Sequence, residues 1–274
     1  METMQIKVKD QYINLNGVTI CYNDLGKGKI PVLFIHGFPF DKSSWQPQME
    51  FLQKTHRVIA FDIRGFGKST AGNEIASINL FADDLIKLMD ALQIKSAIVC
   101  GLSMGGYILL NAVNRYPERF DGIILCDTQC IADSPATKEK RSKSITQVKA
   151  GGLKNYAETF VINVFCSETL ISKKELVEKI KKVIVSTSPL IIIQTLSALG
   201  ERRDMCTALN EISIPALILC GKEDAATMLA QSEYLNHHIA NSTLHYIERA
   251  GHLSNLEQPD VFNNLLIGFI SGLV

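Results

Sequence analysis

The chain has 274 residues, 46% of them hydrophobic, and its 28 Lys and Arg residues balance its 28 Asp and Glu residues. A neutral chain without a basic run gives no electrostatic support for binding nucleic acid or an anionic membrane. Residues 1–10 lack the apolar core of a secretory signal, and the longest candidate apolar run, residues 190–193, is far too short to span a membrane. We therefore expect a cytoplasmic protein whose partner is a small molecule.

Strand and helix signals alternate along the first 127 residues. Asn16-Gly17 lies between two segments of alternating polarity, 11–15 and 18–23, which predicts a β-hairpin. Continuous apolar runs predict buried strands at 31–35, 57–61, 96–100 and 122–126. Helices are expected between them: one capped by Ser43 or Ser44, one capped by Asn79, and one over 107–115.

After Asp127 the pattern becomes wholly helical over residues 132–207, with helices predicted at 138–148, 153–165, 173–185 and 189–199. Strands then return at 215–220 and 243–247, each followed by a helix, at 228–239 and 260–273. This order predicts an α/β fold with a mostly parallel central sheet and helices on both faces. We expect residues 1–131 and 208–274 to form the core, and residues 132–207 to form a helical cap inserted over the carboxyl edge of the sheet. Open α/β sheets bind ligands at that edge.

Seven cysteines are spread along the chain: Cys21, Cys100, Cys126, Cys130, Cys166, Cys206 and Cys220. Their number is odd and no two form a C-x-x-C pair. We therefore interpret most of them as buried thiols in a reducing compartment, rather than as disulfides or metal ligands.

The sequence Gly101-x-Ser103-x-Gly105 comes directly after a predicted strand and directly before a predicted helix. In that context the pattern indicates a sharp turn that exposes a nucleophilic serine at the carboxyl end of the sheet. The following amide, that of Met104, then lies at a helix start, where unpaired N–H groups favour negative charge. Ser103 is therefore the candidate nucleophile.

A serine needs a general base, and a third group must orient that base. Among six histidines, His252 is the best candidate because the Gly251-His252 loop follows the strand at 243–247. Asp224 and Asp127 are both candidate acids, since each follows a strand and keeps the chain order serine, acid, histidine. We prefer Asp224, because the turn at Gly221 frees it from its strand.

Acyl transfer also needs donors for the developing oxyanion. We assign these to the backbone amides of Phe38 and Met104, and we expect Phe38, Met104 and Phe40 to line an apolar substrate pocket. Arg202 and Arg203 could bind a substrate carboxylate. We prefer the simpler interpretation that they end a cap helix and pair with Glu201 or Asp204.

Together these motifs resemble the α/β-hydrolase superfamily over nearly the whole chain. The matching stretches are His36-Gly37-Phe38-Pro39, Asp62-x-Arg64-Gly65-x-Gly67-x-Ser69, Gly101-x-Ser103-x-Gly105-Gly106, Gly221-x-x-Asp224 and Gly251-His252. Within that superfamily the chain is most similar to 3-oxoadipate enol-lactonases and small carboxylesterases. The resemblance implies a Ser-Asp-His hydrolase with no metal and no organic cofactor. One departure is Ala225-Ala226-Thr227-Met228, where the family often has Thr-Pro.

We therefore predict hydrolysis of a small carboxylic ester or lactone through an acyl-enzyme. Perhydrolysis, thioester hydrolysis, carbon–carbon bond hydrolysis and acyl transfer would use the same residues and remain alternatives. A ligand receptor that retained the three residues is a further, less favoured alternative.

Overall fold

The computed structural model describes residues 9–273, so the prediction for residues 1–10 falls almost entirely outside it. Within that range the core is an eight-stranded sheet in the order β1-β2-β4-β3-β5-β6-β7-β8. Strands β3 to β8 pair in parallel, while β1 and β2 add an antiparallel edge. The strands are β1 (Gln11–Asn14), β2 (Thr19–Leu25), β3 (Val32–Ile35), β4 (Val58–Phe61), β5 (Ala97–Leu102), β6 (Phe120–Cys126), β7 (Ala216–Gly221) and β8 (Ser242–Ile247). The predicted α/β class is confirmed.

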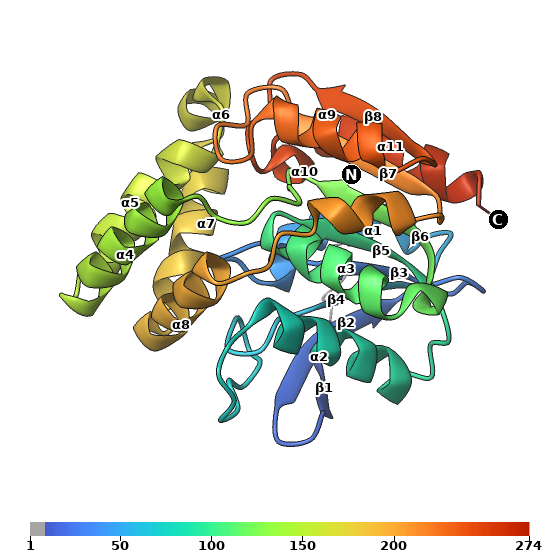
Figure 1. Cartoon of the computed structure of the whole chain (residues 1–274), viewed down its shortest axis with the longest axis horizontal. Helices are drawn as coiled ribbons and strands as arrows, with labels where there is room; N and C mark the ends of the chain where they lie inside the picture. The colour runs from blue at the N-terminus through green and yellow to red at the C-terminus, as the bar shows by residue number, and fades with distance from the viewer. Residues whose placement is uncertain (1–8, 274) are drawn as a thin grey trace, which may run out of the picture.

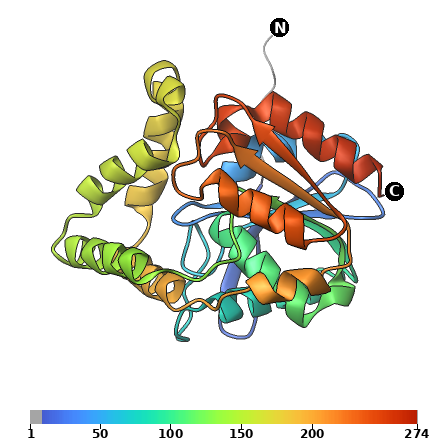
Figure 2. The same ribbon diagram turned by 45° about the horizontal axis from the view of Figure 1, so that its top comes forward.

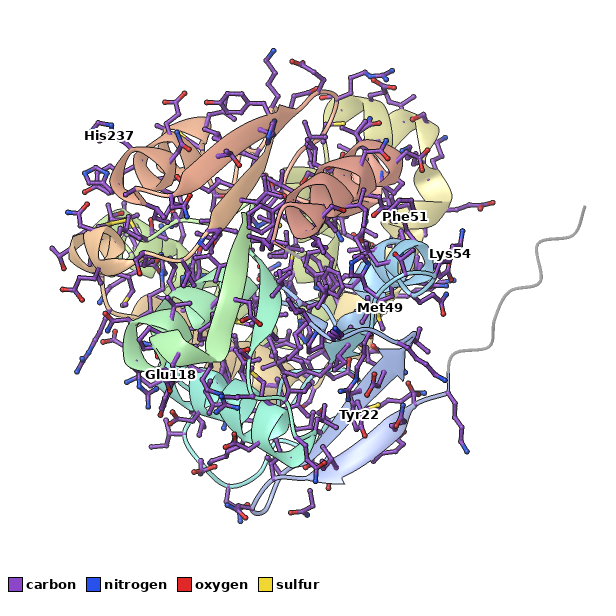
Figure 3. All side chains as sticks on the ribbon, turned by 90° about the vertical axis from the view of Figure 1, so that its right-hand side faces the viewer. Tyr22, Met49, Phe51, Lys54, Glu118 and His237 are labelled. Atoms are coloured by element: carbon purple, nitrogen blue, oxygen red, sulfur yellow. A yellow bond between two sulfur atoms is a disulfide. The ribbon has the colours of Figure 1, made fainter. Side chains whose placement is uncertain are left out.

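Two groups of helices cover the sheet. Helices α1 and α11 pack together on one face, and α2 and α3 pack together on the other. In Figure 3, Phe51 of α1 and Lys54, just beyond that helix, accordingly lie on the opposite side of the strands from His237 of α9 and from Glu118. These core helices are α1 (Gln46–Leu52), α2 (Ile78–Ala91), α3 (Met104–Arg115), α9 (Leu229–His238), α10 (Ser254–Glu257) and α11 (Pro259–Ser271). The long apolar strands are buried because both faces are covered.

The helix caps differ from those predicted. Ser77, not Asn79, caps α2 by accepting a hydrogen bond from the Leu80 amide, and Asn79 instead accepts one from the Asn111 side chain. Asp41, rather than Ser43 or Ser44, caps the 3₁₀ turn that leads into α1. Several polar residues precede each helix, and the tertiary contacts of their side chains decide which one caps it.

The chain between β6 and β7 forms five helices: α4 (Pro135–Lys149), α5 (Leu153–Val164), α6 (Ser167–Ser172), α7 (Lys174–Ser186) and α8 (Pro189–Gly200). They lie together to one side of the sheet, as the green, yellow and gold ribbons in Figures 1 and 2 show. The one-turn helices α6 and α10 were not predicted, because they are too short to show a periodicity. Among residues 9–273 no single helix could span a bilayer, and the one pair that passes by length and composition, α7 with α8, is bent by 95°.

Cys130 and Cys206 form a disulfide, which the sequence analysis did not expect. Cys130 follows β6 and Cys206 precedes β7, so the bond joins the two ends of the segment that carries α4–α8. The Met205 amide also donates to the Cys130 carbonyl at 2.9 Å, which holds the two chains side by side. Sequence spacing could not reveal this pair, because its partners are 76 residues apart and only the fold brings them together. The other five cysteines are buried free thiols, as expected.

We predict that a Cys130→Ser, Cys206→Ser variant unfolds at a lower urea concentration than the native chain. In the chain-entropy account, a cross-link over 76 residues contributes about 4.5 kcal/mol to the free energy of unfolding, and disulfides typically contribute about 2–4 kcal/mol. Dithiothreitol should lower the urea midpoint of the native chain to about that of the variant, and should leave the urea midpoint of the variant unchanged. A native midpoint that dithiothreitol does not move would contradict the prediction.

Candidate active site

Ser103 occupies the turn between β5 and α3 with φ 52° and ψ −113°, a conformation that is strained for any residue except glycine. Neighbouring backbone holds it there. The Ser103 amide donates to the Cys126 carbonyl at 2.9 Å, and the Ser103 carbonyl accepts the Thr128 hydroxyl at 2.8 Å. Ser103 is partly exposed, whereas Leu102 and Met104 on either side are buried. The turn therefore presents this one side chain outward.

The glycines of the motif are explained by close backbone contacts. A Cβ added to Gly101 would lie 2.4 Å from the Gly105 carbonyl oxygen, and one added to Gly105 would lie 2.3 Å from that of Ile35. Because both distances are far shorter than real contacts of a Cβ atom, only glycine lets β5, α3 and β3 meet this closely. The spacing Gly-x-Ser-x-Gly thus follows from packing around Ser103.

His252 and Asp224 form a buried hydrogen-bonded pair. The His252 Nδ1 atom lies 2.8 Å from Asp224 Oδ2, and the two residues are 3% and 6% exposed. Since Nδ1 donates to the carboxylate, Nε2 is the nitrogen left to accept a proton. His252 and Ser103 line the same cavity, of about 310 Å³. The structure thus brings together three residues that are 121 and 28 positions apart along the chain (224 − 103 and 252 − 224).

The two members of this pair shift each other's pKa. Burial would by itself lower the pKa of His252, but the charge and hydrogen bond of Asp224 raise it above the ordinary value. Burial would likewise raise the pKa of Asp224, but the charge of His252 and hydrogen bonds from His252 and Thr227 hold it below the ordinary value. The pair therefore favours an ionised aspartate beside an imidazole that readily accepts a proton.

Thr227 is a site residue that the sequence analysis did not single out. Its hydroxyl donates to Asp224 Oδ2 at 2.6 Å, and its amide donates to Asp224 Oδ1 at 3.0 Å. The Ala226 amide also donates to Oδ1, at 2.7 Å. An aspartate followed three residues later by a threonine is a pattern typical of such side-chain turns, and it could have pointed to this contact. Together these donors fix the carboxylate that orients His252.

Asp127, the other candidate acid, has different partners. Its carboxylate accepts the Gly221 amide at 2.7 Å and the Ser254 hydroxyl at 2.5 Å. Burial and the nearby charge of Asp224 raise the pKa of Asp127 to about 8, so it holds a proton at neutral pH. The geometry therefore favours Asp224 as the partner of the histidine.

Asp127, Cys220 and Asp224 each bring one potential metal-binding atom within 4.8 Å of the other two. Both oxygens of each aspartate already have hydrogen-bond partners. Burial raises the pKa of the Cys220 thiol to about 12, so it remains protonated. This group is thus better described as a hydrogen-bonded cluster than as a metal site.

The loop after β3 lies directly against Ser103. A Cβ added to Gly37 would be 3.3 Å from the Ser103 Cβ atom, and both Phe38 and Met104 line the cavity. His36 braces this loop, because its Nδ1 bonds the Gly37 carbonyl at 2.9 Å and its Nε2 accepts the Ile63 amide at 3.0 Å. Within residues 9–273 neither the Phe38 nor the Met104 amide has a hydrogen-bond acceptor. Both donors are therefore available beside the serine.

Phe40 does not line the cavity, contrary to expectation. It is fully buried, and its ring centroid lies 6.0 Å from that of Phe160, which does line the cavity. Phe40 therefore belongs to the packing beneath the wall. Phe160 and Tyr156 of α5, with Leu196 and Leu199 of α8, supply apolar wall that the sequence pattern did not identify.

Neither Arg202 nor Arg203 lines the cavity that holds Ser103. Arg202 is buried, pairs with Asp133 and lies 4.4 Å from the centre of the Tyr107 ring. Arg202 does pair with an acid, but the expected partner was wrong, because it is Asp133 rather than Glu201 or Asp204. The basic side chains on the cavity are Lys140 and Arg141 of α4. Because α4 carries several other basic residues, no sequence pattern distinguishes these two.

A family model described as the alpha/beta hydrolase fold matches residues 30–168 of this chain. The chain belongs to the α/β-hydrolase fold family. Its hydrolase relatives include 3-oxoadipate enol-lactonase 2 of Acinetobacter baylyi, which is 33% identical over 90% of this chain and 91% of that enzyme.

Two solved structures extend the comparison. A thermophilic esterase from Thermogutta terrifontis, with malate bound, is 32% identical with a TM-score of 0.91, covering 97% of this chain and 99% of that one. The enol-lactonase from Burkholderia xenovorans LB400 is 28% identical with a TM-score of 0.88, covering 95% and 100%. This α/β hydrolase is therefore similar to both lactonases and esterases.

Proposed function

We propose that this α/β hydrolase cleaves a small carboxylic ester or lactone with Ser103 as nucleophile, His252 as general base and Asp224 as the acid that orients His252. The observation that carries the proposal is the buried His252–Asp224 pair in the same cavity as a partly exposed, strained serine. Its relatives among lactonases and esterases support the choice of substrate class.

In the proposed reaction, His252 Nε2 removes the Ser103 hydroxyl proton while Oγ attacks the substrate carbonyl carbon. The carbonyl π electrons move to the oxygen, and the Phe38 and Met104 amides stabilise that oxyanion. Collapse of the tetrahedral intermediate breaks the bond to the alcohol oxygen, which takes the proton from His252. Water then attacks the acyl-enzyme with His252 again as base. Collapse of this second intermediate breaks the bond between the acyl carbon and Ser103 Oγ, which takes the proton back from His252 as the acid leaves. Removing one oxyanion donor typically costs about 2.7–4 kcal/mol.

We also propose that residues 132–207 act as a cap over this site. Support comes from the cavity walls, because α4, α5 and α8 of that segment line the cavity together with Ser103 and His252. A cap of this kind excludes water and strengthens the electrostatic interactions within.

The experiment that tests this function is hydrolysis of p-nitrophenyl acetate by the native protein and by a Ser103→Ala variant. A panel with hydrogen peroxide, thioesters and diketones separates ester hydrolysis from the other reactions open to the same residues. Turnover well above one per site excludes a receptor that retained the three residues.

We predict that kcat/KM falls on the acid side through an apparent pKa above 6.5, the ordinary value for histidine. His252 must be neutral to accept the Ser103 proton, whereas the charge of Asp224 favours the protonated form of His252. As pH falls through the raised pKa, the inactive imidazolium accumulates. A pH–rate profile at constant ionic strength measures this limb. A midpoint below 6.5 would contradict the assignment.

We further propose that the substrate carries an acid group. Lys140 lines the cavity and, among the described residues, has no ion-pair partner, whereas the neighbouring Arg141 is paired with Asp133. A lactone formed from one carboxyl of a dicarboxylic acid such as 3-oxoadipate retains the other carboxylate. This chemistry matches a cavity with an unpaired cation at its wall.

Lys140→Ala should raise KM for mono-p-nitrophenyl succinate by about two- to fivefold, the effect of losing one exposed ion pair. KM for p-nitrophenyl butyrate, which lacks the carboxylate, should stay unchanged. Lys143→Ala is the matched control, because Lys143 lies on the same helix but pairs with Glu139 and does not line the cavity. Equal effects on the two esters would show that Lys140 does not recognise the acid group.

A further inference from the structure

Glu257 is a fully buried acid at the end of α10, five residues after His252. Its Oε1 accepts the Gly251 amide at 2.7 Å, and its Oε2 accepts the Cys166 amide at 2.9 Å. Gly251 immediately precedes His252, whereas Cys166 lies between α5 and α6 of the cap. One carboxylate thus joins the histidine loop to a segment 85 residues earlier in the chain (251 − 166).

The two segments that Glu257 joins are also in direct backbone contact. The His252 amide donates to the Val164 carbonyl at 2.8 Å, and a Cβ added to Gly251 would lie 2.8 Å from the Cys166 nitrogen. Lys173, just beyond α6, donates its ammonium group to the Glu257 main-chain carbonyl. The cap and the histidine loop therefore meet through a backbone hydrogen bond and a close backbone contact.

A carboxylate is the group best suited to this position. The Gly251 and Cys166 amides both donate to this side chain, and a carboxylate offers one acceptor oxygen to each. Hydrogen bonds to an ionised acceptor are shorter and stronger than neutral ones, which offsets the free energy of burying the charge. A glutamine of the same shape could satisfy one amide, but its NH₂ group would face the other N–H donor.

We propose that Glu257 is a positioning residue: through Gly251 it holds His252 on the cavity that Ser103 also lines, and through Cys166 it fastens the cap to the histidine loop. The first half of this proposal rests on the proposed function, since it assumes that His252 is the general base. The second half depends only on the hydrogen bonds.

Several charged groups surround His252. Burial lowers its pKa, while Asp224, Asp127 and Glu257, from three different loops, raise it. Removing the Glu257 charge should therefore move the acid limb of kcat/KM to lower pH, while Asp224 continues to raise the pKa of His252. Lys173 lies against Glu257 through the main-chain carbonyl, so its charge is present in both proteins.

The first experiment compares Glu257→Gln with the native protein on p-nitrophenyl acetate. We expect kcat to fall about 10- to 100-fold, as when a reacting group is displaced by about 1 Å, with KM within about twofold. The acid limb should shift to lower pH. Glu248→Gln is the control, because Glu248 lies on the loop that carries His252 but is exposed and pairs with Lys222. A fall in thermal stability with unchanged kcat and an unchanged pH profile would overturn the positioning role.

The second experiment removes only the cap-side donor. Cys166 has φ −68°, and Phe165 before it has φ −101° and ψ 147°, so the backbone angles suit Cys166→Pro. The substitution deletes the N–H that donates to Glu257 and places the proline Cδ against Oε2, which opens this contact. Cys166→Ala is its control, because it loses the same thiol but keeps the amide. We expect Cys166→Pro to keep kcat near that of Cys166→Ala and to expose the cap to faster cleavage by trypsin. Equal cleavage rates would overturn the fastening role.

Amide hydrogen exchange in the native protein provides a measurement that needs no variant. The Gly251 and Cys166 amides should both be strongly protected, as expected for buried charge-assisted hydrogen bonds. Exchange of these amides at the rate of open loops would overturn the proposed Glu257 clamp, the carboxylate bonded to both amides, even if Ser103 proves to be the nucleophile. Protected amides in a protein whose turnover survives Ser103→Ala would instead contradict only the proposed reaction.

Discussion

Ser103→Ala should lower kcat for p-nitrophenyl acetate by about 10⁵- to 10⁶-fold, the loss seen when a serine hydrolase is deprived of its nucleophile. The reason is that no acyl-enzyme can form. The substitution is conservative for the fold, because alanine meets the same strain as serine at φ 52° and the backbone bonds that hold the turn are retained. Steady-state rates and the initial burst of p-nitrophenol measure the effect.

Ser144→Ala is the matched control for that variant. Ser144 lines the same cavity but comes from α4, away from the turn that carries Ser103. Its removal should change kcat less than about threefold, in the range of substitutions that do not touch reacting groups. Native turnover by Ser103→Ala would show that Ser103 is not the nucleophile.

Asp224→Asn should lower kcat by about 10⁴-fold, whereas Asp127→Asn should lower it by less than about tenfold. In the first variant the amide can present its NH₂ to His252 Nδ1 and favour the wrong tautomer. In the second, an amide replaces a carboxyl group that already holds a proton, because the pKa of Asp127 is raised to about 8. Its oxygen can still accept the Gly221 amide, and its NH₂ can donate to Ser254 Oγ.

The two aspartate variants are each other's control, since both acids are buried near His252 and follow neighbouring strands β6 and β7. Circular dichroism and thermal unfolding establish that both fold. If Asp127→Asn lost as much activity as Asp224→Asn, the assignment of a single orienting acid would be wrong, and the two carboxyl groups would act together.

The fold class could be predicted because its signals are local. Buried parallel strands need continuous apolar runs, and Asn16-Gly17, with φ 53° and 95°, adopts the left-handed pair that a tight hairpin requires. Ser103 could also be selected as a candidate from the sequence, because backbone contacts require glycines at fixed spacing around it. His252 and Asp224 could be selected since both loops leave the carboxyl ends of strands.

The residues that the sequence did not reveal depend on contacts between distant segments. The Cys130–Cys206 bond and the hydrogen bond from the Cys166 amide to Glu257 each join groups that are far apart in the chain, and their sequence neighbours give no sign of the contact. Phe40 and Phe38 are two positions apart and equally apolar, yet only Phe38 lines the cavity.

The sequence alone thus determined the order of strands and helices and the chemical types offered at the sheet edge, because periodicity and turn chemistry act over a few residues. Only the tertiary structure decided which acid pairs with His252, which cations reach the cavity and which two segments Glu257 joins. Those choices depend on distances between segments tens of residues apart, and on burial that shifts the pKa of Asp127 and Asp224 in opposite directions.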